Sequence, residues 1–145
     1  YWMYWYSFYR LLTQRYLFHD SGRENIIKKI LEIKFDVIKK HLALNNDFKA
    51  SDLTFGHLKK LIILHPEQYK HFITNTLDIN TGEELFLTTL DDNFDNIRLL
   101  DGLLASSAFP FVFKPVIIND YILLQWIGEG LISPSPNLYI YKIIN

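Results

Sequence analysis

One stretch, residues 101–115, limits the fold most, because it joins a helical pattern to a segment in which proline forbids a helix. Leucines recur at helical spacing across the start of this stretch, at Leu99, Leu100, Leu103 and Leu104. Pro110 and Pro115 then hold the residues before them in extended geometry. Small residues lie at the junction and permit close approach of the backbone. We therefore predict that the helix stops near Ser107 and that the corner after it packs into the core, with one of two phenylalanines buried, Phe111 or Phe113.

The spacing of apolar residues separates a helical first half from a second half rich in strands. It changes from a period of about 3.6 residues to a period of about two near Tyr69. The pattern predicts helices near Tyr4–Leu17, Arg23–His41, Thr54–Leu61 and Ile97–Ser106, and strands near Tyr69–Thr76 and Glu84–Thr89. Turn residues at 78–82 and 119–120 predict two β-hairpins, the second joining 116–118 to 121–124. The predicted fold class is therefore α/β.

The predicted helix at 23–41 is amphipathic. Ser21 and Glu24 have the spacing of a capping box, so we expect the helix to begin beside them. Its apolar positions form one face, which comprises Ile26, Ile30, Ile33 and Val37 together with Ile27, Leu31, Phe35 and Ile38. Lysines line most of the other side of the helix. We interpret this lysine-rich side as a face exposed to solvent and not as a binding patch.

Composition excludes several classes of protein. A chain of 145 residues with 21% charged residues and a net charge of -1 fits one globular domain or part of one, and it has no general nucleic-acid footprint. The absence of cysteine excludes disulfides and thiolate catalysis. No apolar run approaches the roughly 20 residues that span a bilayer, so a cytoplasmic or membrane-peripheral location is favoured over a transmembrane one.

The first 20 residues are dense in tryptophan, tyrosine and phenylalanine. Two interpretations stay open for this segment. It is an interfacial membrane anchor, or it is a helix whose aromatic face packs on a part of the domain that this sequence lacks, the second being favoured. Because the sequence opens on Tyr1 without a signal-peptide pattern, we expect it to be an internal fragment.

Three ordered segments resemble motifs of one known family. Residues 105–116 read A-S-S-A-x-P-x-x-F-x-P-V, which is similar to a signature late in the patatin-like phospholipase domain. Residues 72–86 resemble the family's strand-turn-strand, with Asp78, Thr81 and Gly82 in matching positions. Residues 54–58 resemble its "T-F-x-x-L" helix start. The resemblance covers roughly residues 51–136 and implies that residues 1–145 form an incomplete three-layer α/β/α patatin-like domain.

The resemblance also implies a catalytic mechanism, but this sequence keeps few of the motifs that the mechanism needs. Patatin-like hydrolases use a serine in a Gly-x-Ser-x-Gly elbow and an aspartate in an Asp-Gly-Gly motif. The sequence contains no Gly-x-Ser-x-Gly. Gly128 stands in the column of the aspartate, and Glu129, one residue later, is a displaced and poor candidate for the catalytic carboxylate. Ser106 and Ser107 match positions that pack the helix end and are not predicted to be nucleophiles.

These absences predict a fragment of a lipid acyl hydrolase that is inactive as this chain, with a lipid or membrane-surface substrate in the parent. The alternative is a pseudoenzyme or binding module that contacts membrane or protein through its aromatic surface. The sequence upstream of Tyr1 separates the two. Asp78, Asp101 and Asp120 are predicted to be turn or cap residues. No cofactor or metal is predicted, because the five histidines form no recognised ligand pair.

Overall fold

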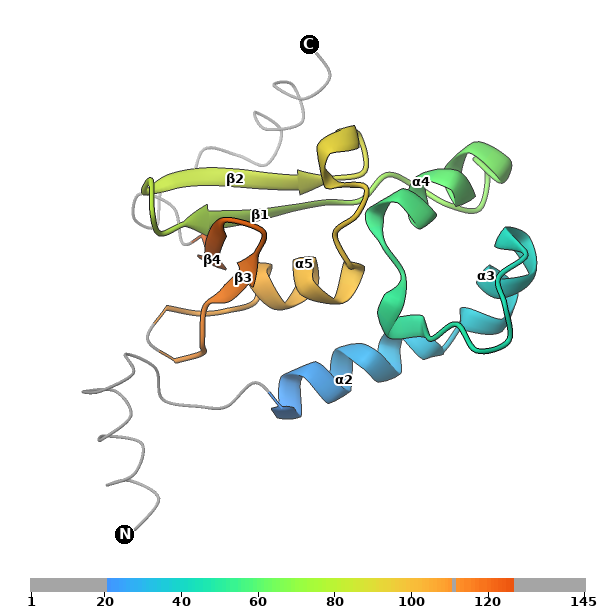
Figure 1. Ribbon diagram of the computed structural model, residues 1–145, viewed down its shortest axis with the longest axis horizontal. Coiled ribbons are helices and arrows are strands. Elements are labelled where there is room, and N and C mark those ends of the chain that lie inside the picture. Colours follow the sequence, from blue (N-terminus) through green and yellow to red (C-terminus); the bar gives the residue numbers. More distant parts are fainter. Residues whose placement is uncertain (1–20, 111, 127–145) are drawn as a thin grey trace, which may run out of the picture.

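A computed structural model describes residues 21–110 and 112–126. Its elements follow one another in the chain as α2 (Ser21–Glu32), α3 (Phe35–Leu42), η1 (Ala50–Asp52), α4 (Phe55–Leu64), β1 (Ile73–Asp78), β2 (Glu83–Thr88), η2 (Asp92–Phe94), α5 (Leu99–Ser106), β3 (Val116–Ile118) and β4 (Tyr121–Gln125) (Figure 1). The mixed α/β class is confirmed. Among these helices none is long and apolar enough to cross a membrane.

The four strands form one antiparallel sheet in the order β2-β1-β4-β3. Each hairpin turns at a residue with positive φ, Gly82 at 69° and Asn119 at 53°. Glycine and asparagine adopt this left-handed geometry most readily, so the two predicted hairpins follow from local turn chemistry. Pairing of β1 with β4 joins the hairpins and sets Asp78 opposite Leu123.

The predicted start of the first strand was wrong. β1 begins at Ile73, because the chain from His65 onward first makes a turn. The backbone N–H groups of Gln68 and Tyr69 both donate to the carbonyl of His65, at 3.0 and 3.1 Å. The N–H groups at the predicted start of the strand are therefore used in this local turn and do not bond within the sheet.

The single helix predicted at 23–41 is two helices. At the joint, the N–H of Ile33 donates to Ile30, three residues back, and regular bonding resumes where Ile38 donates to Lys34. The bend brings the ring of Phe35 within 6.4 Å of Phe48, measured between ring centroids. The apolar face that the sequence indicated is divided into two sets by burial. Ile27, Leu31, Phe35 and Ile38 are partly buried. The exposed set comprises Ile26, Ile30, Ile33 and Val37.

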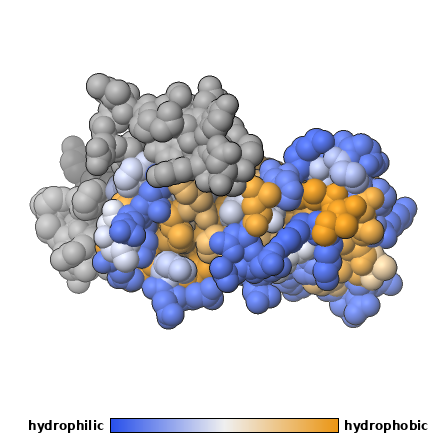
Figure 2. All heavy atoms as spheres, turned by 90° about the horizontal axis from the view of Figure 1, so that it is seen from above, coloured by the Kyte–Doolittle hydropathy of each residue, from blue (hydrophilic) through white to orange (hydrophobic). Residues whose placement is uncertain are grey.

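Hydrophobic residues also reach the surface at the end of the molecule formed by α3 and α4 (Figure 2). On α4 the exposed ones are Ile63 and Leu64, with 73% and 56% of their surface accessible. The described part of the chain therefore carries apolar side chains on its outside as well as in its core.

The core lies where α5 packs across β1, β3 and β4. Phe55, the first residue of α4, is fully buried at its centre and approaches the ring of Phe72 with 5.6 Å between centroids. A Cβ atom added at Gly102 would lie 3.0 Å from the Phe55 ring, so the glycine permits α5 to lie against this ring. The remaining buried members of the cluster are Leu87, Phe94, Ile97, Ala105, Ile118 and Leu123.

The helix start predicted at Thr54 is confirmed, and it uses a histidine that the sequence did not indicate. The Thr54 hydroxyl accepts from the N–H of His57 at 3.2 Å, and Nδ1 of His57 accepts from the N–H of Thr54 at 3.1 Å. This is the reciprocal geometry of a capping box, with imidazole in the place of the usual glutamate or glutamine.

This cap predicts a pH dependence. Burial lowers the pKa of His57, and nearby Lys60 adds to the effect. Since the folded protein favours neutral imidazole, its contribution to stability is complete above the unfolded pKa of about 6.5 and is lost as the pH falls through the lower folded value. Urea unfolding at about pH 7.5 and about pH 5.5 is expected to show a larger loss of stability for the wild type than for His57→Gln. Equal losses would contradict the role of the cap.

Candidate functional site

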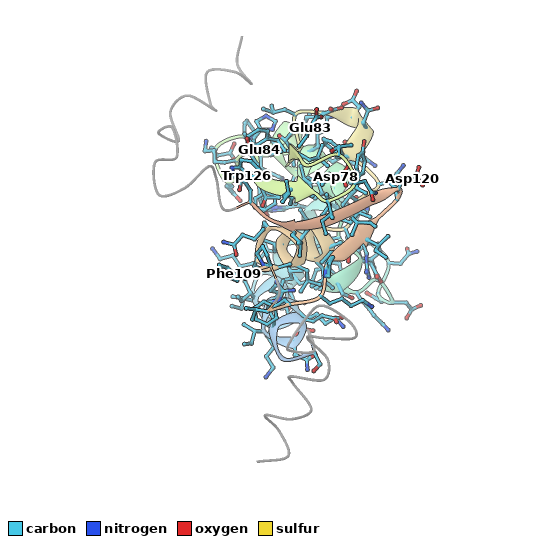
Figure 3. All side chains as sticks on the ribbon, turned by 90° about the vertical axis from the view of Figure 1, so that its left-hand side faces the viewer. Asp78, Glu83, Glu84, Phe109, Asp120 and Trp126 are labelled. Atoms are coloured by element: carbon cyan, nitrogen blue, oxygen red, sulfur yellow. The ribbon has the colours of Figure 1, made fainter. Side chains whose placement is uncertain are left out.

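The corner after α5 lies beside the end of β4. The N–H of Gln125 donates to the carbonyl of Ala108 at 2.9 Å. Figure 3 shows Phe109 and Trp126 on the same side of the molecule, at the opposite end of β4 from Asp120. The last described residues of β4 therefore lie beside this corner. Gly128 and Glu129 lie outside the described residues, so their predicted roles stay predictions.

The two serines of the corner hold the end of α5. Both hydroxyls donate to the carbonyl of Leu103, Ser106 at 3.1 Å and Ser107 at 2.7 Å. Neither is bonded to a histidine or a carboxylate in the part of the chain that the structure describes, which is what a nucleophile would need for activation. Their contacts are those of helix-end residues.

Arg23 is the residue of this corner that sequence reasoning missed. From the first turn of α2, its Nη1 donates to the Leu104 carbonyl and the Ser107 hydroxyl, both at 2.9 Å. Its guanidinium also lies over the ring of Phe113, with 4.4 Å from Cζ to the centroid. A cation at a helix C-terminus is favourable because the last carbonyls carry partial negative charge. Arg23 therefore fastens α2 to the corner.

Replacing Arg23 by methionine is expected to lower the free energy of unfolding by about 1–3 kcal/mol, because it removes charge-assisted hydrogen bonds and leaves their acceptors without this donor. The matched control is Arg98→Met. Arg98 forms a bidentate pair with Asp101 at 2.8 Å but is largely exposed, so its loss is expected to cost under about 1 kcal/mol. Urea unfolding of both variants measures the difference, and equal costs would show that Arg23 does not fasten the corner.

An apolar groove of about 690 Å³ lies between α2 and α5, next to Arg23. Isoleucines of α2 form one wall, and the end of α5 with Phe113 forms the other. The lining residues are Gly22, Arg23, Ile26, Ile27, Ile30, Leu103, Ser106, Ser107 and Phe113. A groove of this size with a few polar groups at one end has the character of a site for an apolar ligand.

Phe113 is half-buried in the groove wall, and Phe111 lies outside the described residues. The prediction that one of them belongs to the core is thus not fulfilled by Phe113. The buried aromatic residues of the core cluster are Phe55 and Phe94, and Phe113 is not among its buried members.

The three aspartates lie at turns or helix starts. Asp78 is buried, and its carboxylate accepts from Asn80 N at 3.2 Å, from the hydroxyl of Thr81 at 3.2 Å and from Ile122 N at 3.4 Å, so it ties the two hairpins together. Asp101 pairs with Arg98, and this hydrogen bond raises the pKa of Arg98 above its ordinary value. Asp120 lies in the turn between β3 and β4.

His41 and His65 lie side by side, although the sequence suggested that each was isolated. The rings of His41 and His65 have centroids 4.1 Å apart, and Nδ1 of His41 is 3.0 Å from the hydroxyl of Tyr69. These contacts join α3 to the end of α4. Within the ranges 21–110 and 112–126 no three potential metal ligands come together.

Comparison with known proteins found similarity to one family and to a viral protein. A family model described as patatin-like phospholipase matches residues 1–136, which extends the similarity upstream of the motifs at 51–136. The chain is 51% identical over 110 residues to uncharacterized protein L620 of Acanthamoeba polyphaga mimivirus. That alignment covers 74% of the chain and 30% of the viral protein, so the chain spans about a third of the length of this relative. No solved structure matches the chain.

Proposed function

Because the chain belongs to the patatin-like phospholipase family, we propose that it forms the later part of a lipid acyl hydrolase domain and supplies no nucleophile itself. The observation that carries the proposal is the family match over residues 1–136 in a sequence without Gly-x-Ser-x-Gly. The parent would cleave ester bonds of phospholipids or acylglycerols through a serine–aspartate dyad. Glu129 would be a displaced carboxylate at the base position.

In this proposal the groove between α2 and α5 receives an acyl chain. Its walls are mainly aliphatic and aromatic, which suits a hydrocarbon tail, and burial of each methylene contributes about 0.8 kcal/mol. One end of the groove is lined by Ser106 and Ser107 of the corner beside which β4 ends, so an acyl chain bound there would reach this corner.

Binding of a fluorescent fatty acid to the purified chain tests the groove. Ser106→Phe is expected to fill it and raise the Kd by about tenfold, equivalent to about 1.4 kcal/mol. Ser106→Ala is the matched control, because it removes only a hydroxyl that bonds within α5 and should bind as the wild type does. Ile26→Gln, at an exposed position of the groove wall, is a second variant that is expected to weaken binding without disturbing the core. Wild-type affinity in both Ser106→Phe and Ile26→Gln would reject this assignment.

The alternative is a non-catalytic binding module, and the same groove favours it. Gly128 in place of the aspartate removes the base while leaving an apolar site that needs no chemistry to bind a lipid. A Gly-x-Ser-x-Gly elbow upstream of Tyr1, together with ester hydrolysis by the longer protein, would favour the hydrolase. A longer protein that binds acyl chains and hydrolyses none would favour the module.

A further inference from the structure

The outward side of α2 and α3 keeps a row of large apolar side chains in solvent. Ile26, Ile30, Ile33 and Val37, here called the isoleucine row, have 62%, 57%, 75% and 48% of their surface exposed. Ile26 and Ile30 lie four residues apart on one side of α2, Ile33 follows at the joint, and Val37 lies in the first turn of α3. Large apolar side chains that gather on an exposed surface can mark a site of interaction.

Positive charge borders the isoleucine row. Lys29 and Lys40 lie three residues from Ile26 and Val37 on the same helices, so they emerge near the row. Lys34 lies at the joint between α2 and α3, next to Ile33. All three are exposed, and none forms an ion pair with another described residue. Residues 21–42 hold six basic and three acidic side chains, a net charge of +3 in a chain whose net charge is -1. The basic charge is thus concentrated around the exposed apolar side chains.

We propose that the isoleucine row and its three lysines dock on a membrane surface that contains anionic lipid. Helices that lie in the plane of a membrane combine an apolar stripe, which enters the boundary between headgroups and acyl chains, with lysines that contact anionic headgroups. Ile26 and Ile30 also line the groove, so a docked protein has the mouth of the groove at the lipid surface. This surface adds to the proposed function and does not depend on turnover, because vesicle binding and ester hydrolysis are measured separately.

Vesicle cosedimentation of the full chain tests the proposal, with vesicles of phosphatidylcholine alone and of phosphatidylcholine mixed with phosphatidylserine. The wild type is expected to bind the mixed vesicles more tightly than those of phosphatidylcholine alone, and this binding is expected to weaken at high salt. Ile30→Gln with Ile33→Gln is expected to reduce partitioning by about tenfold on both kinds of vesicle. Changing Lys29, Lys34 and Lys40 to glutamine is expected to reduce it by roughly a hundredfold on mixed vesicles only.

Each variant has a control elsewhere on the surface. Ile117→Gln makes the same change at a side chain of β3 that is 68% exposed. Glutamine at the exposed Lys60, Lys70 and Lys114 removes the same net charge. Both controls should bind as the wild type does.

Two results would overturn the docking surface. One is that the variant Ile30→Gln with Ile33→Gln binds vesicles as tightly as the wild type, or that the variants and their controls lose vesicle binding equally. The other is a dimer in light scattering that Ile30→Gln with Ile33→Gln dissociates, because the row would then be covered by a second copy of the chain.

Discussion

The purified chain is expected to hydrolyse neither short acyl esters nor phospholipid vesicles at neutral pH. Loss of the nucleophile alone lowers the turnover of a serine hydrolase by about 10⁶, and the rate that remains depends on the oxyanion donors. This sequence has no Gly-x-Ser-x-Gly, and we predict that Gly128 occupies the position of the family's aspartate. The hydroxyls of Ser106 and Ser107 are committed to the end of α5. Neither serine of the corner is therefore expected to attack an ester.

A fluorogenic ester assay measures this, with Glu129→Gln as the control. Turnover by the wild type that disappears in Glu129→Gln would show that the displaced carboxylate is catalytic after all. Turnover that survives in Glu129→Gln but disappears in Ser106→Ala or Ser107→Ala would identify a nucleophile at the corner. Either result would contradict the inactivity proposed for this chain, whereas fatty-acid binding and vesicle binding would be unaffected by it.

Replacing Phe55 by alanine is expected to lower the free energy of unfolding by about 3–5 kcal/mol. Phe55 is fully buried between α5 and the sheet, and Gly102 lies against its ring so closely that the site has little freedom to collapse. The cavity left by the ring would therefore stay largely open. Urea unfolding followed by circular dichroism measures the loss.

Phe109→Ala is the matched control. The ring of Phe109 is 47% exposed and lies at the corner outside the core cluster, so its removal is expected to change stability by less than about 0.5 kcal/mol. Similar losses in the two variants would contradict a core built around Phe55.

Local chemistry was sufficient for the parts of the fold that depend on a few adjacent residues. Gly82 and Asn119 predicted both hairpin turns, and the prolines at 110 and 115 predicted the end of α5, because each restricts its own backbone dihedral angles or those of a neighbour. Thr54 predicted the start of α4 for the same reason. The motifs in these segments also predicted the family, which the match over residues 1–136 confirms.

The candidate site depended on contacts between distant segments. In the sequence Arg23 was one residue of a capping box, and only the packing of α2 against α5 brings it to Leu104 and Ser107, 81 and 84 residues away. The same packing forms the groove.

The two hairpins, the end of α5 and the family could be predicted from the sequence, because residues that restrict the backbone act on their immediate neighbours. Long-range packing was needed to place Phe55 at the centre of the core, to bend the helix after Glu32 and to leave half of its apolar face in solvent. A periodic pattern shows that apolar residues share a face. Which of them are buried depends on the surface that other elements offer, and that surface exists only after the chain has folded.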